Sequence, residues 1–311
     1  MTPGKTYLSS DDIRQLAVRS NLMGVWMLLH CWGVIAGAVA VFALLPNPLT
    51  FLLAVAIIGS RQLGLAILMH EAAHNALFRT RALNDFAGEW LCGRPILAEL
   101  ASYRHYHLAH HRHTQTDKDP DLILSSKFPT SRASLQRKFL RDLTGQTGIK
   151  QLVAQVLMSF RLAGDDDAIQ AATQDAAQAF KARDLWKSLP IFAAIMFIMS
   201  LSGQWWYGFA FWLLPYLTWF QLVLRIRNIA EHGATEMSDN PLQNVRTTLA
   251  NPIARAFVAP YWVNYHLEHH LVMHMPCWRL PQLHRLLRAK GLTPDMRIAP
   301  SYKAALREAG W

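Results

Sequence analysis

The sequence has few cysteines and no nucleotide or haem fingerprint. Only three of its 311 residues are cysteine, and Cys31, Cys92 and Cys277 lie far apart in the chain. This spacing argues against a disulfide framework, a cysteine zinc site and an iron–sulfur cluster. The chain also lacks a GxGxxG nucleotide motif and an HPGG haem motif. Any metal chemistry must therefore depend on histidine.

Charged residues are also sparse. They make up 17% of the chain, whereas 52% is hydrophobic and 11 residues are tryptophan, which is too apolar for an ordinary soluble protein of this size. The first 20 residues are polar, so we expect no cleavable signal peptide. Internal repeats and a second folded domain are not expected either, which leaves one domain over residues 1–311. Four apolar segments predict transmembrane helices in two hairpins, at residues 21–45, 49–69, 186–201 and 205–224.

The basic residues avoid the two hairpin turns. Residues 1–20 contain 3 Lys or Arg, residues 70–187 contain 16 and residues 225–311 contain 11. The positive-inside rule places both termini and the segments of about 70–185 and 225–311 in the cytoplasm, as a helical cap on an all-α membrane protein. We expect the inner membrane of a bacterium. We interpret the net charge of +10 as a signal for the orientation of the protein in the membrane, and no motif supports nucleic-acid binding.

Eight of the fourteen histidines fall into three clusters, HEAAH, HLAHH and HLEHH. On a helix, residues four apart project from one face, so each cluster contains one chelating pair, and the third histidine of each HxxHH lies beside that pair. Eight imidazoles exceed what one metal ion can bind, so two metals are implied. The clustered histidines are His70, His74, His107, His110, His111, His266, His269 and His270. By contrast, His30, His105, His113, His274 and His284 lack partners at both helical spacings and are expected to be ordinary core or surface residues.

Several polar residues near the clusters are further candidates. Asn228 and His232 are four apart and follow the last apolar segment, which makes His232 a candidate ninth ligand. Glu71 and Glu268 lie inside clusters but off the ligand face, so they either orient an imidazole or are surface charges. Asp119 and Asp121, in DKDPD, are expected to support the site from outside or to cap a turn, rather than bind metal.

The second apolar segment contains Arg61 and Gln62 before His70. An ionisable group at that depth is a candidate site for a substrate head group, and snorkelling to the membrane edge is the alternative. Residues 149–160 carry an apolar stripe that predicts a helix on the membrane surface or, alternatively, a core-facing helix. Residues 168–184 are typical of a solvated helix or linker.

The motifs HEAAHNALF, YHLAHHRHT with DKDPD, NIAEH and NYHLEHHLVMHMP resemble those of the membrane-bound histidine-box fatty acid desaturases, over nearly the whole chain. The resemblance implies four membrane helices and a cytosolic cap in which nine histidines bind two irons, with Asn228 reaching one metal through water. The nine matching positions are His70, His74, His107, His110, His111, His232, His266, His269 and His270.

The resemblance also implies the reaction class. Oxidation of an unactivated C–H bond requires a redox metal that activates O₂, and zinc has no redox chemistry, so iron is favoured. We expect an O₂-dependent desaturase of lipid acyl chains, served by an external ferredoxin or cytochrome that docks on the basic cap. A lipid or carotenoid hydroxylase or ketolase on the same scaffold is the main alternative. A zinc-dependent membrane hydrolase and a non-catalytic metal-binding protein are weaker ones.

Overall fold

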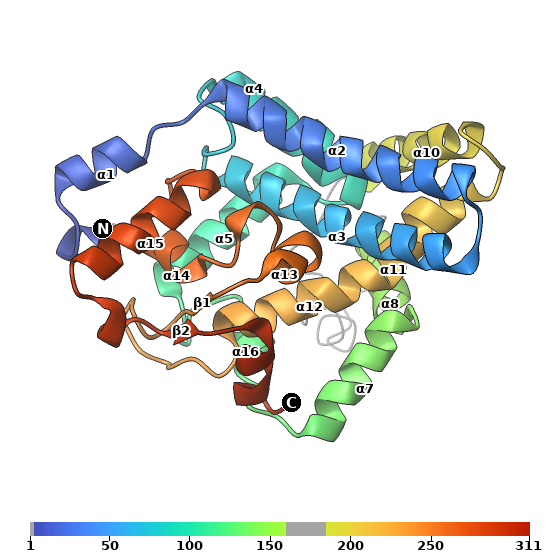
Figure 1. Cartoon of the computed structure of the whole chain (residues 1–311). Helices are drawn as coiled ribbons and strands as arrows, with labels where there is room; N and C mark the ends of the chain where they lie inside the picture. Colours follow the sequence, from blue (N-terminus) through green and yellow to red (C-terminus); the bar gives the residue numbers. More distant parts are fainter. Residues whose placement is uncertain (1–2, 160–184) are drawn as a thin grey trace.

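The structure is a computed structural model that describes residues 3–159 and 185–311, and helices dominate it (Figure 1). Two short strands, β1 (Thr247–Thr248) and β2 (Ile298–Ala299), pair in parallel. The α-helices are α1 (Ser10–Leu16), α2 (Asn21–Leu44), α3 (Pro48–Ala73), α4 (Arg81–Phe86), α5 (Leu100–His113), α6 (Leu122–Ser125), α7 (Arg132–Leu143), α8 (Gln146–Ser159), α10 (Leu185–Leu201), α11 (Leu214–Leu217), α12 (Trp219–His232), α13 (Pro252–Phe257), α14 (His266–Leu271), α15 (Leu280–Ala289) and α16 (Tyr302–Glu308). Short 3₁₀ or π turns are η1 (Pro3–Thr6), η2 (Ala87–Gly93), η3 (Arg94–Ile96), η4 (Phe209–Leu213), η5 (Pro260–Trp262), η6 (Cys277–Arg279) and η7 (Thr293–Asp295).

Helices α2 and α3 form the first hairpin, and both are long and apolar enough to cross a membrane. Asn47 starts α3, because its side chain accepts hydrogen bonds from the backbone N–H groups of Leu49 (3.0 Å) and Thr50 (3.1 Å). Pro48 follows at the first helical position, where its missing N–H costs nothing. The tight turn between residues 44 and 48 is therefore built as the sequence predicts.

Helix α3 extends further than expected. The predicted segment ends at residue 69, whereas the helix continues to Ala73 and carries His70 inside it and His74 at its C-terminal cap. The prediction followed hydrophobicity, which stops at Met69, but no proline or glycine interrupts the helix there. Its last two thirds are buried, so α3 runs through the centre of the protein and delivers the first histidine cluster to the interior.

The second hairpin matches the predicted bounds at its first member and differs from them at its second. Helix α10 has 17 residues and is the shorter apolar helix, so the described residues contain three helices that meet the length for a span. The third of these covers Phe209–His232 instead of beginning at Trp205, whose side chain is 77% exposed. It is not a regular helix, because η4 and α11 lead to a break at Thr218 before α12 begins.

Helix α8 contains most of the predicted apolar stripe. Ile149 and Val153 are exposed, whereas Leu152 and Val156 pack against the core, so the helix has an apolar outer face as well as an inner one. The core-facing alternative thus describes one face of the helix, and the location of its exposed face on a membrane surface stays a prediction. Phe160 and the expected linker at 168–184 lie outside the described residues.

Candidate metal centre

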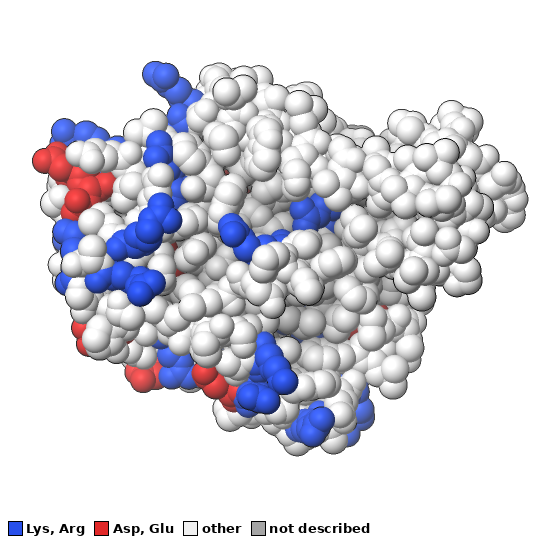
Figure 2. All heavy atoms as spheres, viewed as in Figure 1, with Lys and Arg blue, Asp and Glu red and all other residues white. Residues whose placement is uncertain are grey.

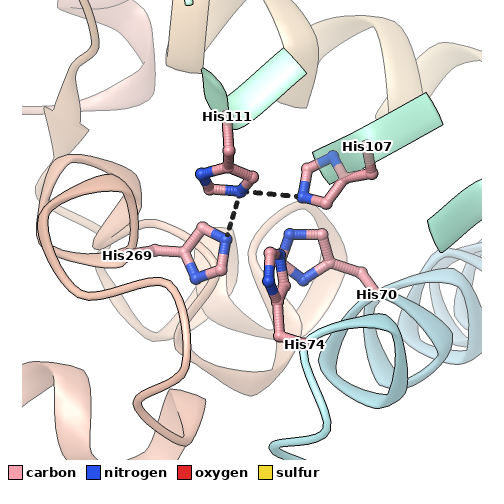
Figure 3. Close-up of side chains that lie close together, drawn as sticks. All are labelled: His70, His74, His107, His111 and His269. Carbon is pink, nitrogen blue, oxygen red and sulfur yellow. Dashed lines mark hydrogen bonds between the residues drawn. The ribbon is translucent and has the colours of Figure 1, made fainter. Parts of the chain in front are cut away.

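The nine candidate histidines gather into two groups at the centre of the cap. In each group one ring nitrogen from every member lies within 4.8 Å of the others. Figure 3 shows the first group, whose rings point toward one another from α3, α5 and α14. It contains His70, His74, His107, His111 and His269. The second group contains His110, His232, His266 and His270, from α5, α12 and α14.

Each HxxHH cluster divides between the two groups. His107 and His111 lie together in the first group, whereas His110 belongs to the second. In HLEHH the assignment is reversed, because His266 and His270 enter the second group and His269 the first. Residues i and i+4 differ by about 40° around a helix, but i+3 and i+4 differ by about 100°. Two helices facing each other can therefore build two adjacent sites.

The spacing of the nitrogens fits a shared metal ion in each group. The Nε2 atom of His111 lies 2.9 Å from Nε2 of His107 and 3.1 Å from Nε2 of His269. In the second group, Nε2 of His266 lies 2.8 Å from Nε2 of His232 and 3.1 Å from Nε2 of His270. Two nitrogens bound at right angles to one ion at about 2.1 Å lie about 3.0 Å apart.

Buried nitrogens without hydrogen-bond partners support the same conclusion. They include Nε2 of His70, of His74 and of His110. A buried polar atom without a partner is costly, and it is rare in native proteins unless an ion or a water satisfies it. The donor set therefore fits two metal ions held by histidine.

The electrostatics keep most of these rings neutral, which is the form that binds metal. Burial, reinforced by neighbouring histidines, holds the pKa of His107, His111, His269 and His270 well below the ordinary value. His110 is the exception. Burial alone would lower its pKa, but Asp121 and Asp119 beside it raise it above the ordinary value.

Asp119 contacts the second group directly. Its carboxylate oxygen lies 2.8 Å from Nδ1 of His110, and the same side chain accepts hydrogen bonds from the backbone N–H groups of Gln115 and Asp121, both at 2.8 Å. It thus joins the turn after α5 to the imidazole. Asp121 lies further away, 3.6 Å from Nδ1 of His110, and accepts a hydrogen bond from the hydroxyl of Tyr106.

The two glutamates inside the clusters behave differently from each other. One Glu71 oxygen lies 3.6 Å from Nδ1 of His70, and the other accepts the backbone N–H of Cys277 at 2.8 Å. Glu268 is fully buried, and its side chain forms no hydrogen bond or ion pair with the nine histidines within the described residues. It lies 2.6 Å from Nδ1 of His284 and accepts the hydroxyl of Thr247, so it links α14 to α15 and β1.

The end of α12 contains residues that the sequence did not reveal. Glu231 lies 3.7 Å from Nε2 of His266 and pairs with Arg227 at 2.7 Å. The fully buried Arg246 donates to the carbonyls of Ile229 (3.3 Å) and Ala230 (3.2 Å), one turn before His232. Glu231 lies inside the NIAEH motif but was not singled out from it, and Arg246 lies outside every quoted motif.

Asn228 lies beside the second group. It lines a small cavity of about 40 Å³ together with His110, His232 and His266. The site thus retains space on one side of the second group, next to an amide that can donate and accept hydrogen bonds.

Arg61 and Gln62 do not join the histidines. Arg61 is buried, and its Nη2 donates to the carbonyl of Ala256 at 2.5 Å, while Gln62 donates to the carbonyl of Trp212 at 2.9 Å. Arg61 therefore does not snorkel to the surface. The histidines expected to be ordinary, which are His30, His105, His113, His274 and His284, also lie outside both groups.

The fold and the centre together define a mostly helical protein with three candidate membrane-spanning helices and two histidine groups that could hold metal. The family model for fatty acid desaturases matches residues 46–300. The chain therefore belongs to the fatty acid desaturase family, as its motifs predicted.

Two characterised relatives share this family resemblance. Dihydrorhizobitoxine desaturase of Bradyrhizobium elkanii is 26% identical over 279 residues, which cover 86% of this chain and 75% of that protein. The sn-1 oleoyl-lipid 12-desaturase of Synechocystis sp. is 26% identical over 253 residues, which cover 74% of this chain and 66% of that protein. Their names give different substrates, so family membership indicates the reaction class but does not select a substrate.

Proposed function

We propose that the protein is an O₂-dependent di-iron desaturase that introduces a double bond into the acyl chain of a lipid. The observation that carries the proposal is the convergence of nine imidazoles in two adjacent groups, with few other donor types at the centre. Bound iron would supply the redox chemistry that activates O₂, which zinc cannot. Desaturation converts –CH₂–CH₂– and O₂, with two electrons and two protons, into –CH=CH– and two waters, so an external ferredoxin or cytochrome must provide the electrons.

The residues of the chain have distinct tasks in this proposal. The histidines hold the metals, and the carboxylate of Asp119 fixes the ring orientation of His110. Burial of the centre excludes bulk water, which protects an oxidising site from side reactions. Asn228 and the adjoining cavity provide space where a reacting group can approach the second group.

A second, larger cleft supports a substrate route. It has a volume of about 440 Å³ and shares Leu124 and Asn228 with the cavity beside the metals. Arg225 lines the cleft but is paired with the buried carboxylate of Asp142, at 2.5 and 2.9 Å. Four more basic side chains and no acidic one line it among the described residues: Lys127, Lys138, Arg141 and Lys150. This lining suits an anionic head group, with the acyl chain passing Leu124 toward the centre. A Leu124→Trp variant should block the route, with the iron content unchanged.

The direct test combines metal and product analysis. Purified protein should contain about two irons per chain and little zinc, and host lipids should lose two hydrogens in the product. A product that gains one oxygen instead would establish the hydroxylase or ketolase alternative. His107→Ala should abolish product formation, whereas His105→Ala is the matched control, because His105 is exposed on the same helix and lies outside both groups.

We also propose the topology that the sequence predicted, with one domain, four spans and both termini in the cytoplasm. Helix α10 has 17 residues, or about 25 Å at 1.5 Å per residue, which approaches the thickness of the apolar core of a bilayer. Cysteines introduced at Asn47 and Gly203, in the two hairpin turns, should be labelled from outside the inner membrane. Labelling of either position only from the cytoplasm would overturn the topology.

A further inference from the structure

A cleft lined partly by two candidate membrane spans contains basic and aromatic side chains that have no task in the proposed reaction. It lies between α2, α3, α13 and η5, has a volume of about 490 Å³ and is open to the surroundings. Its walls are aromatic and apolar, and they include Trp26, Tyr261 and Trp262. Three nitrogen-rich side chains also line it, Arg61, Arg255 and His30.

Arg61 is the unusual member of this cleft. It lies in the middle of a candidate span, its side chain is only 5% exposed, and it donates a hydrogen bond to the backbone carbonyl of Ala256. Within residues 3–159 and 185–311, no carboxylate pairs with it. A guanidinium has five N–H donors, and a buried charge without a counter-ion is costly. The charge therefore needs an anion that the described chain does not supply.

Arg255 adds a second positive charge to the same cleft. Its side chain is exposed, its guanidinium carbon lies 6.0 Å from the ring centre of Trp262, and no ion pair involves it in the described chain. On the opposite wall, Trp26 stacks on His30 at 5.2 Å, and His30 lies 3.1 Å from the Tyr261 hydroxyl. The cleft thus combines two unpaired guanidinium groups with aromatic walls.

The surroundings of the cleft indicate which kind of anion can reach it. Leu29 and Ile253 beside it are 68% and 72% exposed, and two lining helices, α2 and α3, are candidate spans. Figure 2 shows basic atoms in the hollow over α3 and α13 with uncharged atoms immediately around them, whereas the other charged atoms in this view lie toward its left and lower sides. A ligand must therefore be anionic at one end and apolar along its length. Guanidinium groups bind phosphate through paired hydrogen bonds, and aromatic side chains are typical of the head-group level.

We propose that this cleft binds the phosphate head group of an anionic membrane lipid through Arg61 and Arg255. The site is separate from the basic cleft beside the metals, and it does not depend on the proposed reaction. The cleft is linked to the histidine groups through the backbone, because Tyr261 lines the cleft and belongs to η5, which precedes His266 by a few residues. Tyr261 also packs closely on Gly64 of α3, where an added Cβ would lie 3.1 Å from its ring. A bound lipid would therefore stabilise the segment that leads into α14.

The test measures lipid binding on the full-length protein in neutral detergent. Micelles doped with phosphatidylglycerol should raise the Tm by several degrees, and phosphatidylcholine should not. Arg255→Gln should weaken phosphatidylglycerol binding about tenfold, since a charge-assisted hydrogen bond to phosphate is lost. Because Arg255 is exposed, this variant should fold normally. Arg61→Lys retains the buried positive charge and removes the planar guanidinium, so it tests whether paired hydrogen bonds from that group are needed.

The control is Arg288→Gln, which removes the same charge from an exposed position on α15, outside the cleft. It should bind phosphatidylglycerol as the unmodified protein does. Unchanged binding in Arg255→Gln, or equal stabilisation by phosphatidylcholine, would overturn the proposal. Inorganic phosphate is the remaining probe, and stabilisation by it alone to the same extent would show a phosphate site instead of a lipid site.

Discussion

The two histidine groups use the same side chain but have different surroundings. The first group has five imidazoles, and a single carboxylate, Glu71, lies 3.6 Å from one of them. The second has four imidazoles, with Asp119 at hydrogen-bond distance, Asp121 and Glu231 nearby, and a cavity on one side. We therefore infer that metal binding in the first group depends mainly on its number of imidazoles. In the second group it depends more on the residues around the imidazoles.

This difference suggests how two neighbouring sites can have unequal tasks. A group with five neutral donors leaves little room for another ligand, whereas four donors beside a cavity leave an approach open. Carboxylates near the second group raise the basicity of its imidazoles and offset the charge of a bound cation. If the two groups differ in this way, single substitutions should reduce iron binding more strongly in the second group than in the first.

The largest effect on iron content is expected for His266→Ala. His266 contacts both His232 and His270, at 2.8 and 3.1 Å. Its removal leaves three imidazoles in the second group, those of His110, His232 and His270. Iron content should fall from about two to about one per chain, and product formation should drop at least about 100-fold. His74→Ala leaves four imidazoles in the first group and should retain more iron than His266→Ala. Equal iron loss in both variants would remove the proposed asymmetry.

Asp119→Asn should have the next largest effect. The amide can still contact His110 but no longer provides a charge, so iron affinity of the second group should decrease about 10- to 100-fold. Competition with a chelator on the reconstituted protein measures this directly. Asp121→Asn serves as the comparison, because Asp121 lies 0.8 Å further from the same nitrogen, at 3.6 Å against 2.8 Å. If the two variants lose iron equally, the direct contact between Asp119 and His110 does not determine the iron affinity of the second group.

Arg246→Lys should affect the second group through the backbone. Lysine cannot reach the carbonyls of Ile229 and Ala230 and also the carboxylate of Glu308, which Arg246 contacts at 2.9 Å. The loss should reduce the free energy of unfolding by about 1–3 kcal/mol and leave His232 less well positioned. Thermal unfolding gives the first quantity and the stoichiometry of bound iron the second. Iron loss confined to the first group would contradict this role.

Much of the centre can be predicted from the sequence because its signal is local. A histidine pair four apart on a helix is visible without tertiary information, and so is the closeness of Asp119 to the second cluster. The division of each cluster between two groups requires the packing of α5 against α14, which no local pattern contains. Arg246 was invisible for the same reason, since it contacts α12 from the residue just before β1, which no helical spacing relates to Ile229 and Ala230.

The helix bounds show a similar limit. Hydropathy located α2 to within one residue but ended α3 four residues early, because the end of an apolar run is not the end of a helix. In the second hairpin, the same reasoning missed the irregular stretch around Thr218, where buried aromatic packing overrides local preference. Glu268 could not be separated from Glu71 by its place in a cluster either, because its partner His284 comes from another helix.

The smallest effect is expected for Glu71→Gln. Glu71 lies inside HEAAH and Glu268 lies inside HLEHH, but the distance of 3.6 Å from Glu71 to His70 is too long for a hydrogen bond. Its other oxygen accepts the N–H of Cys277, which a glutamine oxygen can also do. Iron affinity of the first group should therefore change less than about threefold, well below the effect of Asp119→Asn. A loss as large as that of Asp119→Asn would show that the first group also depends on a carboxylate, and the two groups would then differ in ligand number alone.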